Sequence, residues 1–207
     1  MPGVNDGLVV FLHGVGASGA SLARFGEPLS AFLPTAAFAA PDAPAPFDGG
    51  GPGRQWFSVA GIGADNRQRR VEQAREAFDR IVSAALAARG FAGRLDRVAL
   101  FGFSQGAIMA LDAIASGRWP VAAVVAASGR LPGPADPLPA AAATPALLLH
   151  GEADAIVPAE ESRRAATRLK AAGFTADARI FARLGHSISG AGVEAAGTFL
   201  ARALTPA

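Results

Sequence analysis

Hydrophobic residues are concentrated in short continuous runs that are separated by longer mixed segments. The runs are rich in Val, Leu, Phe and Ala, which is typical of strands buried on both faces of a parallel sheet. They predict strands at Leu8–Leu12, Ala36–Ala40, Arg97–Phe103, Val121–Ala127, Ala146–Leu149 and Ala176–Phe181.

Between these runs, apolar residues recur at the three- and four-residue spacing of amphipathic helices. The clearest helix has Val71, Ala74, Phe78, Ile81, Val82 and Leu86 on its inner side, ends at Gly90, and has Asp65 and Gln68 as an expected capping pair. Further helices are predicted around Leu22, Phe25, Leu29 and Phe32, around Ala107, Ala110, Leu111 and Ile114, and at Ala159–Ala172 and Gly192–Leu204. This alternation predicts an α/β fold with a mostly parallel sheet of about six or seven strands and helices on both faces.

No internal repeat or long linker divides the 207 residues, so we expect a single domain over residues 1–207 without a large cap domain. Two segments depart from the alternation. Ala43–Arg54 is rich in Pro and Gly, and we expect an irregular surface loop there that delivers Trp56 to a substrate pocket. Leu131–Ala143 is biased toward Pro and Ala and is predicted to be a surface loop, with a small lid as the alternative.

The charge balance gives no reason to expect a nucleic-acid partner. The calculated pI is 10.3, yet the formal net charge is only +2. Because the chain has no Cys, no Tyr and the single lysine Lys170, almost nothing titrates between neutral pH and the arginines, and the calculated pI overshoots.

The sequence also predicts a soluble, cytoplasmic protein. Absence of cysteine excludes disulfides and thiol catalysis and is compatible with the cytosol. Met1–Gly7 lacks the cations of a secretory signal, and the apolar runs are too short or too interrupted by glycine for stable membrane insertion.

The strand at Arg97–Phe103 leads into Gly102-Phe103-Ser104-Gln105-Gly106, which has the G-x-S-x-G spacing. A helical pattern follows directly. Strand, sharp turn and helix form the context of a nucleophile elbow, in which a Cβ on either glycine would collide with neighbouring backbone. We therefore predict that Ser104 is a nucleophile.

A serine hydroxyl becomes nucleophilic when a base takes its proton and an acid orients that base. On this fold the partners follow in the order serine, acid, histidine, which selects His186 and sets aside His13 and His150. Asp154 is the predicted acid, and Glu152 in the same turn is the alternative. The loops that carry these residues begin at the carboxyl ends of strands, where the working loops of parallel sheets gather.

Acyl transfer also needs donors for the oxyanion. The backbone N–H groups of Gln105, directly after the serine, and of Val15, in the loop after the first strand, are the candidates. The same loop contains Gly14-x-Gly16-x-x-Gly19, with Asp42 after the next strand, as in a dinucleotide-binding fingerprint. That weaker alternative, an oxidoreductase, leaves the elbow and the Asp154 and His186 turns unexplained.

Taken together, these stretches resemble the phospholipase/carboxylesterase family of α/β-hydrolases, relatives of the acyl-protein thioesterases. The resemblance is carried, in the family's order, by LHGVGASG, RQWFSV, GFSQGAIMAL, HGEADAIVP and GHSIS. It implies an α/β-hydrolase fold, Ser104, Asp154 and His186 as a catalytic triad, the amides of Val15 and Gln105 as an oxyanion hole, and no cofactor or metal. Trp56 falls near the family's acyl pocket, with packing under a loop as the equal alternative.

Two departures from the family bear on the expected substrate. Only seven residues precede the first strand, so we expect a sheet trimmed at its N-terminal edge. Gly61-Ile62-Gly63 stands where related thioesterases carry a longer lipid-facing loop, which favours small soluble esters over lipidated proteins. The expected activity is hydrolysis of short to medium acyl esters, with lysophospholipids or thioesters left open. A homodimer is also left open, and the non-enzymatic alternative is a catalytically silent ligand-binding protein.

Overall fold

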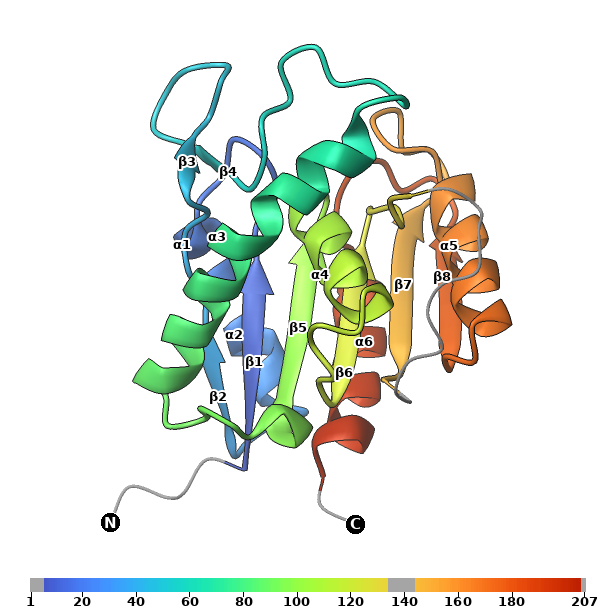
Figure 1. Cartoon of the computed structure of the whole chain (residues 1–207). Coiled ribbons are helices and arrows are strands. Elements are labelled where there is room, and N and C mark those ends of the chain that lie inside the picture. The colour runs from blue at the N-terminus through green and yellow to red at the C-terminus, as the bar shows by residue number, and fades with distance from the viewer. Residues whose placement is uncertain (1–5, 134–143, 206–207) are drawn as a thin grey trace.

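The computed structural model describes residues 6–133 and 144–205, which are built on a parallel six-stranded sheet (Figure 1). The strand order is β2-β1-β5-β6-β7-β8, and every neighbouring pair is parallel. The strands are β1 (Gly7–Leu12), β2 (Ala36–Ala39), β5 (Val98–Phe103), β6 (Ala123–Ala127), β7 (Ala146–Gly151) and β8 (Ala176–Phe181). The predicted α/β-hydrolase sheet is confirmed at the lower end of the expected strand number.

Helices cover both faces of the sheet. One face carries α3 (Arg67–Ala88), α4 (Gln105–Ala115) and α5 (Glu160–Ala171), and the other carries α1 (Gly19–Ala23), α2 (Gly26–Ser30) and α6 (Gly190–Leu204) (Figure 1). A 3₁₀ turn, η1, spans Leu95–Arg97. No separate cap domain is present in the described parts of the chain.

The core consists of two apolar layers, because successive side chains of a strand point to opposite faces. In β1, Leu8 and Val10 pack toward α3 and α4, whereas Val9 and Phe11 pack toward α2 and α6. We expected one buried side for the helix after Ser104, but all eleven residues of α4 are buried. The reason is that α4 packs against the sheet and against α3, and the side chains of Arg75 and Arg118 cover Asp112.

The single helix expected around Leu22–Phe32 is wrong, since the segment forms the two short helices α1 and α2. Pro28 explains the break. In a continuous helix, residue 28 would donate its N–H to the carbonyl of Arg24, and proline has no N–H. The first helix therefore ends with Arg24 as its C-cap, and the second begins at Gly26.

The predicted capping pair on α3 is also wrong. The N-cap is Asn66, and Asp65 is exposed. Asn66 instead closes the preceding turn, because its Oδ1 accepts the N–H of Gly63 and its Nδ2 donates to the carbonyl of Gly61.

The Pro/Gly-rich loop before Trp56 is more regular than expected. It forms a small antiparallel pair of β3 (Ala45–Pro46) and β4 (Arg54–Gln55). Of the predicted loop or lid at Leu131–Ala143, only residues 131–133 are described, and residues 134–143 lie outside the described residues.

Candidate active site

Ser104 occupies a strained turn between β5 and α4. Its φ and ψ angles are 51° and −115°, in a region that residues with a side chain rarely adopt. The neighbouring glycines allow this turn. A Cβ on Gly102 would lie 2.5 Å from the backbone of Ala107, and a Cβ on Gly106 would overlap the carbonyl oxygen of Leu12. The strand, turn and helix thus have the geometry of a nucleophile elbow.

The side chains of Ser104, His186 and Asp154 form a continuous hydrogen-bonded chain. His186 Nε2 lies 3.0 Å from Ser104 Oγ, and His186 Nδ1 lies 2.7 Å from Asp154 Oδ2. A carboxylate can only accept, so Nδ1 carries the proton and Nε2 is free to accept the serine proton. The three residues come from the carboxyl ends of β5, β7 and β8, which face one edge of the sheet (Figure 1).

Asp154 has three hydrogen-bond donors and a nearby imidazole around it, and its side chain has no exposed surface. Its Oδ1 accepts the N–H groups of Ile156 and Val157, both at 2.9 Å. Its Oδ2 lies 2.7 Å from His186 Nδ1 and 3.2 Å from His150 Nε2. Burial alone would raise the pKa of Asp154, but the hydrogen bonds from Val157, His186 and Ile156 bring the pKa below its ordinary value. Asp154 is therefore ionised at neutral pH.

Glu152, the alternative acid, is exposed on the same turn and has no hydrogen bond to His186. The two carboxylates differ in their direction, because Asp154, two residues later in the turn, points inward to His186 whereas Glu152 points to solvent.

His150 is a contact of this site that sequence reasoning set aside. It is 1% exposed, and its Nε2 donates to the carbonyl of Val157 at 2.8 Å while lying near Asp154. Its Nδ1 lies 2.6 Å from the hydroxyl of Ser162 in α5. The sequence did offer a signal for this contact, because His150 ends a buried strand four residues before the predicted acid.

The loop after β1 is organised by a second buried histidine. His13 Nδ1 donates to the carbonyl of Gly14 at 2.7 Å, and its Nε2 accepts the N–H of Ala43 at 3.0 Å. Trp56 packs beside the His13 ring and donates its indole N–H to the His13 carbonyl at 2.9 Å.

The position of Trp56 favours packing over substrate contact, the two alternatives that the sequence left open. The side chain is 2% exposed and packs edge-on against Phe78 of α3. Its indole thereby connects α3 to the loop that carries the proposed oxyanion donor.

The two candidate oxyanion donors are backbone N–H groups that follow β1 and Ser104. Gln105 is the first residue of α4, so its N–H has no acceptor within the helix. Its side chain is used elsewhere: Oε1 accepts the N–H of Trp56 at 2.7 Å, and Nε2 donates to the carbonyl of Phe57 at 2.7 Å. Val15 lies in the turn after β1, and its N–H has no hydrogen-bond partner within the described ranges.

The residues that match a dinucleotide-binding fingerprint make structural contacts within the protein instead. Asp42 Oδ1 accepts the N–H of Gly19 at 2.7 Å, so the acid closes the glycine loop itself. A Cβ on Gly19 would overlap the carbonyl of Ala40, which shows that this glycine serves close packing.

Neither a metal cluster nor a membrane span is found in the part of the chain that the structure describes. Over residues 6–133 and 144–205, no group of three or more His, Asp or Glu side chains is arranged to hold a metal ion. Within the same residues, no helix combines the length and the hydrophobicity that a membrane crossing requires.

Comparison with known proteins gives a consistent result. A family model described as phospholipase/carboxylesterase matches residues 4–204. Esterase YpfH of Escherichia coli (strain K12) is 34% identical over 181 residues, which cover 87% of this chain and 76% of that protein. The crystal structure of esterase PE8 superposes with a TM-score of 0.85 at 32% identity, covering 98% of this chain and 96% of that one.

A further relative has a different description. A protein of Oryza sativa subsp. japonica described as a probable inactive carboxylesterase is 28% identical over 201 residues, covering 87% of this chain and 78% of that protein. Sequence similarity at this level is therefore shared with a relative that is described as probably inactive.

Proposed function

Because the chain belongs to the phospholipase/carboxylesterase family, we propose that it is a serine carboxylesterase that hydrolyses short to medium acyl esters through an acyl-enzyme. The observation that carries the proposal is the chain of hydrogen bonds from Ser104 Oγ through His186 to Asp154 Oδ2, with lengths of 3.0 and 2.7 Å. These are the distances expected between a nucleophile, its base and the group that orients the base.

In the proposed first step, Ser104 Oγ attacks the ester carbonyl while His186 Nε2 takes the hydroxyl proton. Asp154 keeps the Nδ1 proton in place and stabilises the imidazolium that forms. The N–H groups of Gln105 and Val15 are the proposed donors to the tetrahedral oxyanion, and each such donor contributes on the order of 100- to 1,000-fold in rate.

The imidazolium then returns its proton to the departing alcohol, which leaves an acyl-Ser104. In the second half, His186 takes a proton from water, the resulting hydroxide attacks the acyl carbonyl, and Ser104 is regenerated with release of the acid. No atom in this sequence comes from a cofactor or a metal.

The preference for short to medium acyl chains rests on the brief segment between Trp56 and α3. Residues Gly61–Gly63 form a tight turn closed by Asn66, so this segment offers little surface to a long lipid. Thioesters and lysophospholipids remain candidate substrates, and a chain-length series of esters compared with an acyl thioester and a lysophospholipid would rank them.

The second candidate function is a catalytically silent ligand-binding protein. It is favoured by the similarity to the rice protein that is described as probably inactive. Against it stands the intact hydrogen-bonded chain at Ser104, which a binding protein would not require.

The proposal is tested by replacing Ser104 with alanine. We expect S104A to lose turnover of p-nitrophenyl butyrate by more than about 1,000-fold, because the attacking oxygen is removed. We also expect a fluorophosphonate probe to label the unsubstituted protein and not S104A. Ser187, an exposed serine beside His186, supplies the matched control S187A, which should keep both labelling and turnover.

Circular dichroism on S104A verifies that the variant is folded. A folded, unsubstituted protein that neither turns over the ester nor reacts with the probe would establish the silent alternative.

A further inference from the structure

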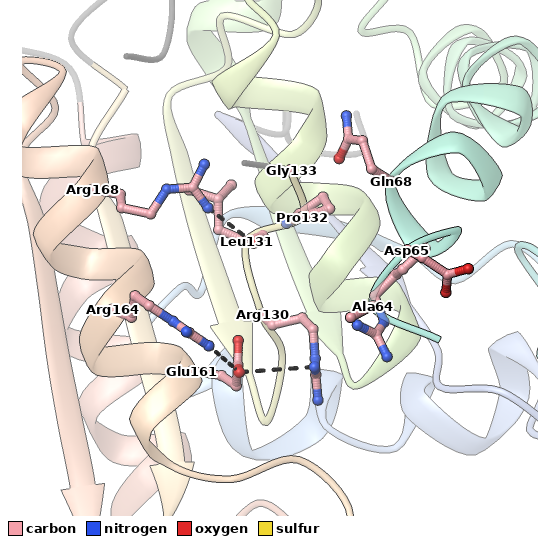
Figure 2. Close-up of a pocket in the computed structure, with 11 residues that line it drawn as sticks. Ala64, Asp65, Gln68, Arg130, Leu131, Pro132, Gly133, Glu161, Arg164 and Arg168 are labelled. Atoms are coloured by element: carbon pink, nitrogen blue, oxygen red, sulfur yellow. Dashed lines mark hydrogen bonds and ion pairs between the residues drawn. The ribbon is translucent and has the colours of Figure 1, made fainter. Parts of the chain in front are cut away.

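A pocket lined by arginines includes the loop after β6, which leaves the sheet at the same carboxyl edge as the loops of the candidate active site. It has a volume of about 510 Å³ and is formed by the start of α3, the loop after β6 and one side of α5. Its guanidinium groups belong to Arg67, Arg130, Arg164 and Arg168, and we call it the arginine pocket. Figure 2 shows Arg130, Arg164 and Arg168 around Glu161 and the loop at Leu131.

Among the described residues that line the arginine pocket, positive charges outnumber negative ones. The carboxylates that line it are Asp65, which is exposed, and Glu161. Glu161 is shared, since it pairs with Arg164 and also lies 3.8 Å from Arg130. Arg67, which is half-buried, has no ion pair within the described ranges. Even without Arg168, the described lining residues thus place the three guanidinium groups of Arg67, Arg130 and Arg164 with the two carboxylates of Asp65 and Glu161.

These guanidinium groups are also partly desolvated. Burial lowers the pKa of Arg130, and the nearby charges of Arg67 and Arg164 lower it further, while Glu161 opposes the shift. Burial and the charge of Arg164 likewise lower the pKa of Arg168, again against Glu161. Guanidinium groups stay protonated in proteins, so the repulsion among them persists. An anion bound among them would relieve it.

Hydrogen bonds and packing connect the arginine pocket to the elbow. The N–H of Ser104 donates to the carbonyl of Ala127, the last residue of β6, at 2.8 Å. Since consecutive Cα atoms are about 3.8 Å apart, the Cα of Arg130 lies within roughly 11 Å of the Cα of Ala127. Between them, Gly129 packs against Ala107 of α4 so closely that a Cβ there would lie 2.5 Å from the Ala107 side chain.

We propose that the arginine pocket binds an anionic group, a carboxylate or a phosphate, on a small molecule. Guanidinium groups match the planar, bidentate geometry of carboxylate and phosphate oxygens. The source that the position favours is the substrate itself: an ester that carries its negative charge at the end remote from the scissile carbonyl. This choice of source rests on the proposed esterase function, whereas the anion site does not.

The arginines also help to hold their own loop. Arg168 donates to the carbonyl of Leu131 at 3.2 Å, which makes it unsuitable for a test. Among the described residues, the ion pair of Arg130 is the 3.8 Å contact with Glu161, and Glu161 keeps Arg164 when Arg130 is replaced. R130Q is therefore the informative variant.

The first experiment compares two esters of matched length, mono-p-nitrophenyl glutarate and p-nitrophenyl hexanoate. The quantity measured is the ratio of kcat/KM for glutarate to kcat/KM for hexanoate. We expect this ratio to fall by about tenfold or more in R130Q, the scale of one lost charge-assisted hydrogen bond. R163Q is the matched control, because Arg163 lies on the exposed side of α5, outside the pocket, and should leave the ratio unchanged.

The second experiment uses inorganic phosphate as the probe and thermal stability as the readout. A ligand that binds only the folded protein raises Tm. We expect phosphate to raise the Tm of the unsubstituted protein above that in chloride at equal ionic strength, and R130Q to reduce this increase while R163Q retains it.

The two experiments separate the sources of the anion. An Arg130-dependent ester ratio identifies the substrate as the source, and an Arg130-dependent phosphate effect alone identifies a free anion. If neither readout depends on Arg130, the anion site is overturned. Failure of the esterase proposal would show as absent hexanoate hydrolysis, and the phosphate experiment would still decide the anion site.

Discussion

The loops after β1 and β7 are both pinned by a buried histidine at the strand end, yet the two histidines are held differently. His13 uses one nitrogen to donate to the Gly14 carbonyl and the other to accept the N–H of Ala43. His150 donates to the Val157 carbonyl, and its other nitrogen meets the hydroxyl of Ser162. Burial lowers the pKa of both imidazoles.

The difference lies in what faces the second nitrogen. An N–H group can only donate, so His13 cannot take up a proton without losing the bond from Ala43. A hydroxyl can donate or accept, so Ser162 could turn and accept a hydrogen bond from Nδ1 of a protonated His150. Both neutral tautomers are therefore fixed, with the proton on Nδ1 of His13 and on Nε2 of His150, but only His150 can take up a second proton and still find an acceptor for it.

The two loops also differ in how much of the chain holds them. The loop after β1 is fixed from a distance, by Asp42 on the N–H of Gly19 and by Trp56 on the His13 carbonyl. The loop after β7 is held partly from within, by Asp154, Val157 and Ser162, and partly by the loop after β8, where the carbonyl of Leu184 accepts the N–H of Ala153. The first carries a proposed backbone donor that must stay still, and the second carries the proposed acid, which is directly adjacent to His150.

The largest expected effect tests whether the loop after β7 supplies the acid. We expect D154N to lower kcat by about 1,000- to 10,000-fold, because an amide no longer holds the proton on His186 Nδ1. Glu152 is the matched control in the same turn, and E152Q should change kcat by less than about threefold because its side chain is exposed. The measurement is kcat on p-nitrophenyl butyrate, and equal losses in both variants would remove the distinction between the two carboxylates.

The second prediction compares the two histidines directly. H13Q and H150Q should each lower the free energy of unfolding by about 1 to 3 kcal/mol, because each leaves buried groups without a partner. H150Q should also lower kcat by about tenfold while H13Q keeps more of it, because only His150 touches Asp154.

Urea unfolding gives the free energies, and kcat and KM are measured on the folded fraction. S162A serves as the milder control, because it removes the group opposite Nδ1 and leaves the His150 imidazole in place. Equal kcat values for H13Q and H150Q would show that the contact with Asp154 does not position the acid.

The same comparison shows what sequence can predict. Each residue of the chain Ser104, Asp154 and His186 follows a strand that can be recognised from its apolar composition. Because a parallel sheet brings the carboxyl ends of its strands together, the proximity of the three residues was predictable. The sequence could not decide whether Trp56 packs in the core or contacts the substrate, because the deciding contact is with Phe78 in a separate helix. Tertiary contacts of this kind leave no periodic pattern in the sequence.

The contact between His150 and Asp154 was missed for a related reason. Chain order excluded His150 as the base, and no local pattern indicates that a strand-ending histidine turns inward to a carboxylate four residues later. The break between α1 and α2 is different, since Pro28 is visible in the sequence and is sufficient to indicate it.

The smallest expected effect is on the pH dependence of stability. The pKa of each buried histidine is lowered from its ordinary value of 6.5, so each stays neutral in the folded state while the unfolded chain takes up a proton. The unfolded state then binds more protons, and stability present above pH 6.5 is lost as the pH falls toward the folded pKa. Each histidine contributes a loss of at most about 1.4 kcal/mol between pH 7.5 and 5.5.

His13 should account for more of this loss than His150. The charge of Asp42 raises the pKa of His13 and that of Arg54 lowers it. The N–H that Ala43 donates to His13 Nε2 would be lost if that nitrogen took up a proton. For His150, the charge of His186 lowers the pKa and that of Asp154 raises it, and the Ser162 hydroxyl can accept a hydrogen bond from the protonated ring. Unfolding in urea at the two pH values should therefore show a flatter profile in H13Q than in H150Q, and S162A should steepen the profile. The reverse order would mean that the carboxylate of Asp154 does not offset the burial of His150.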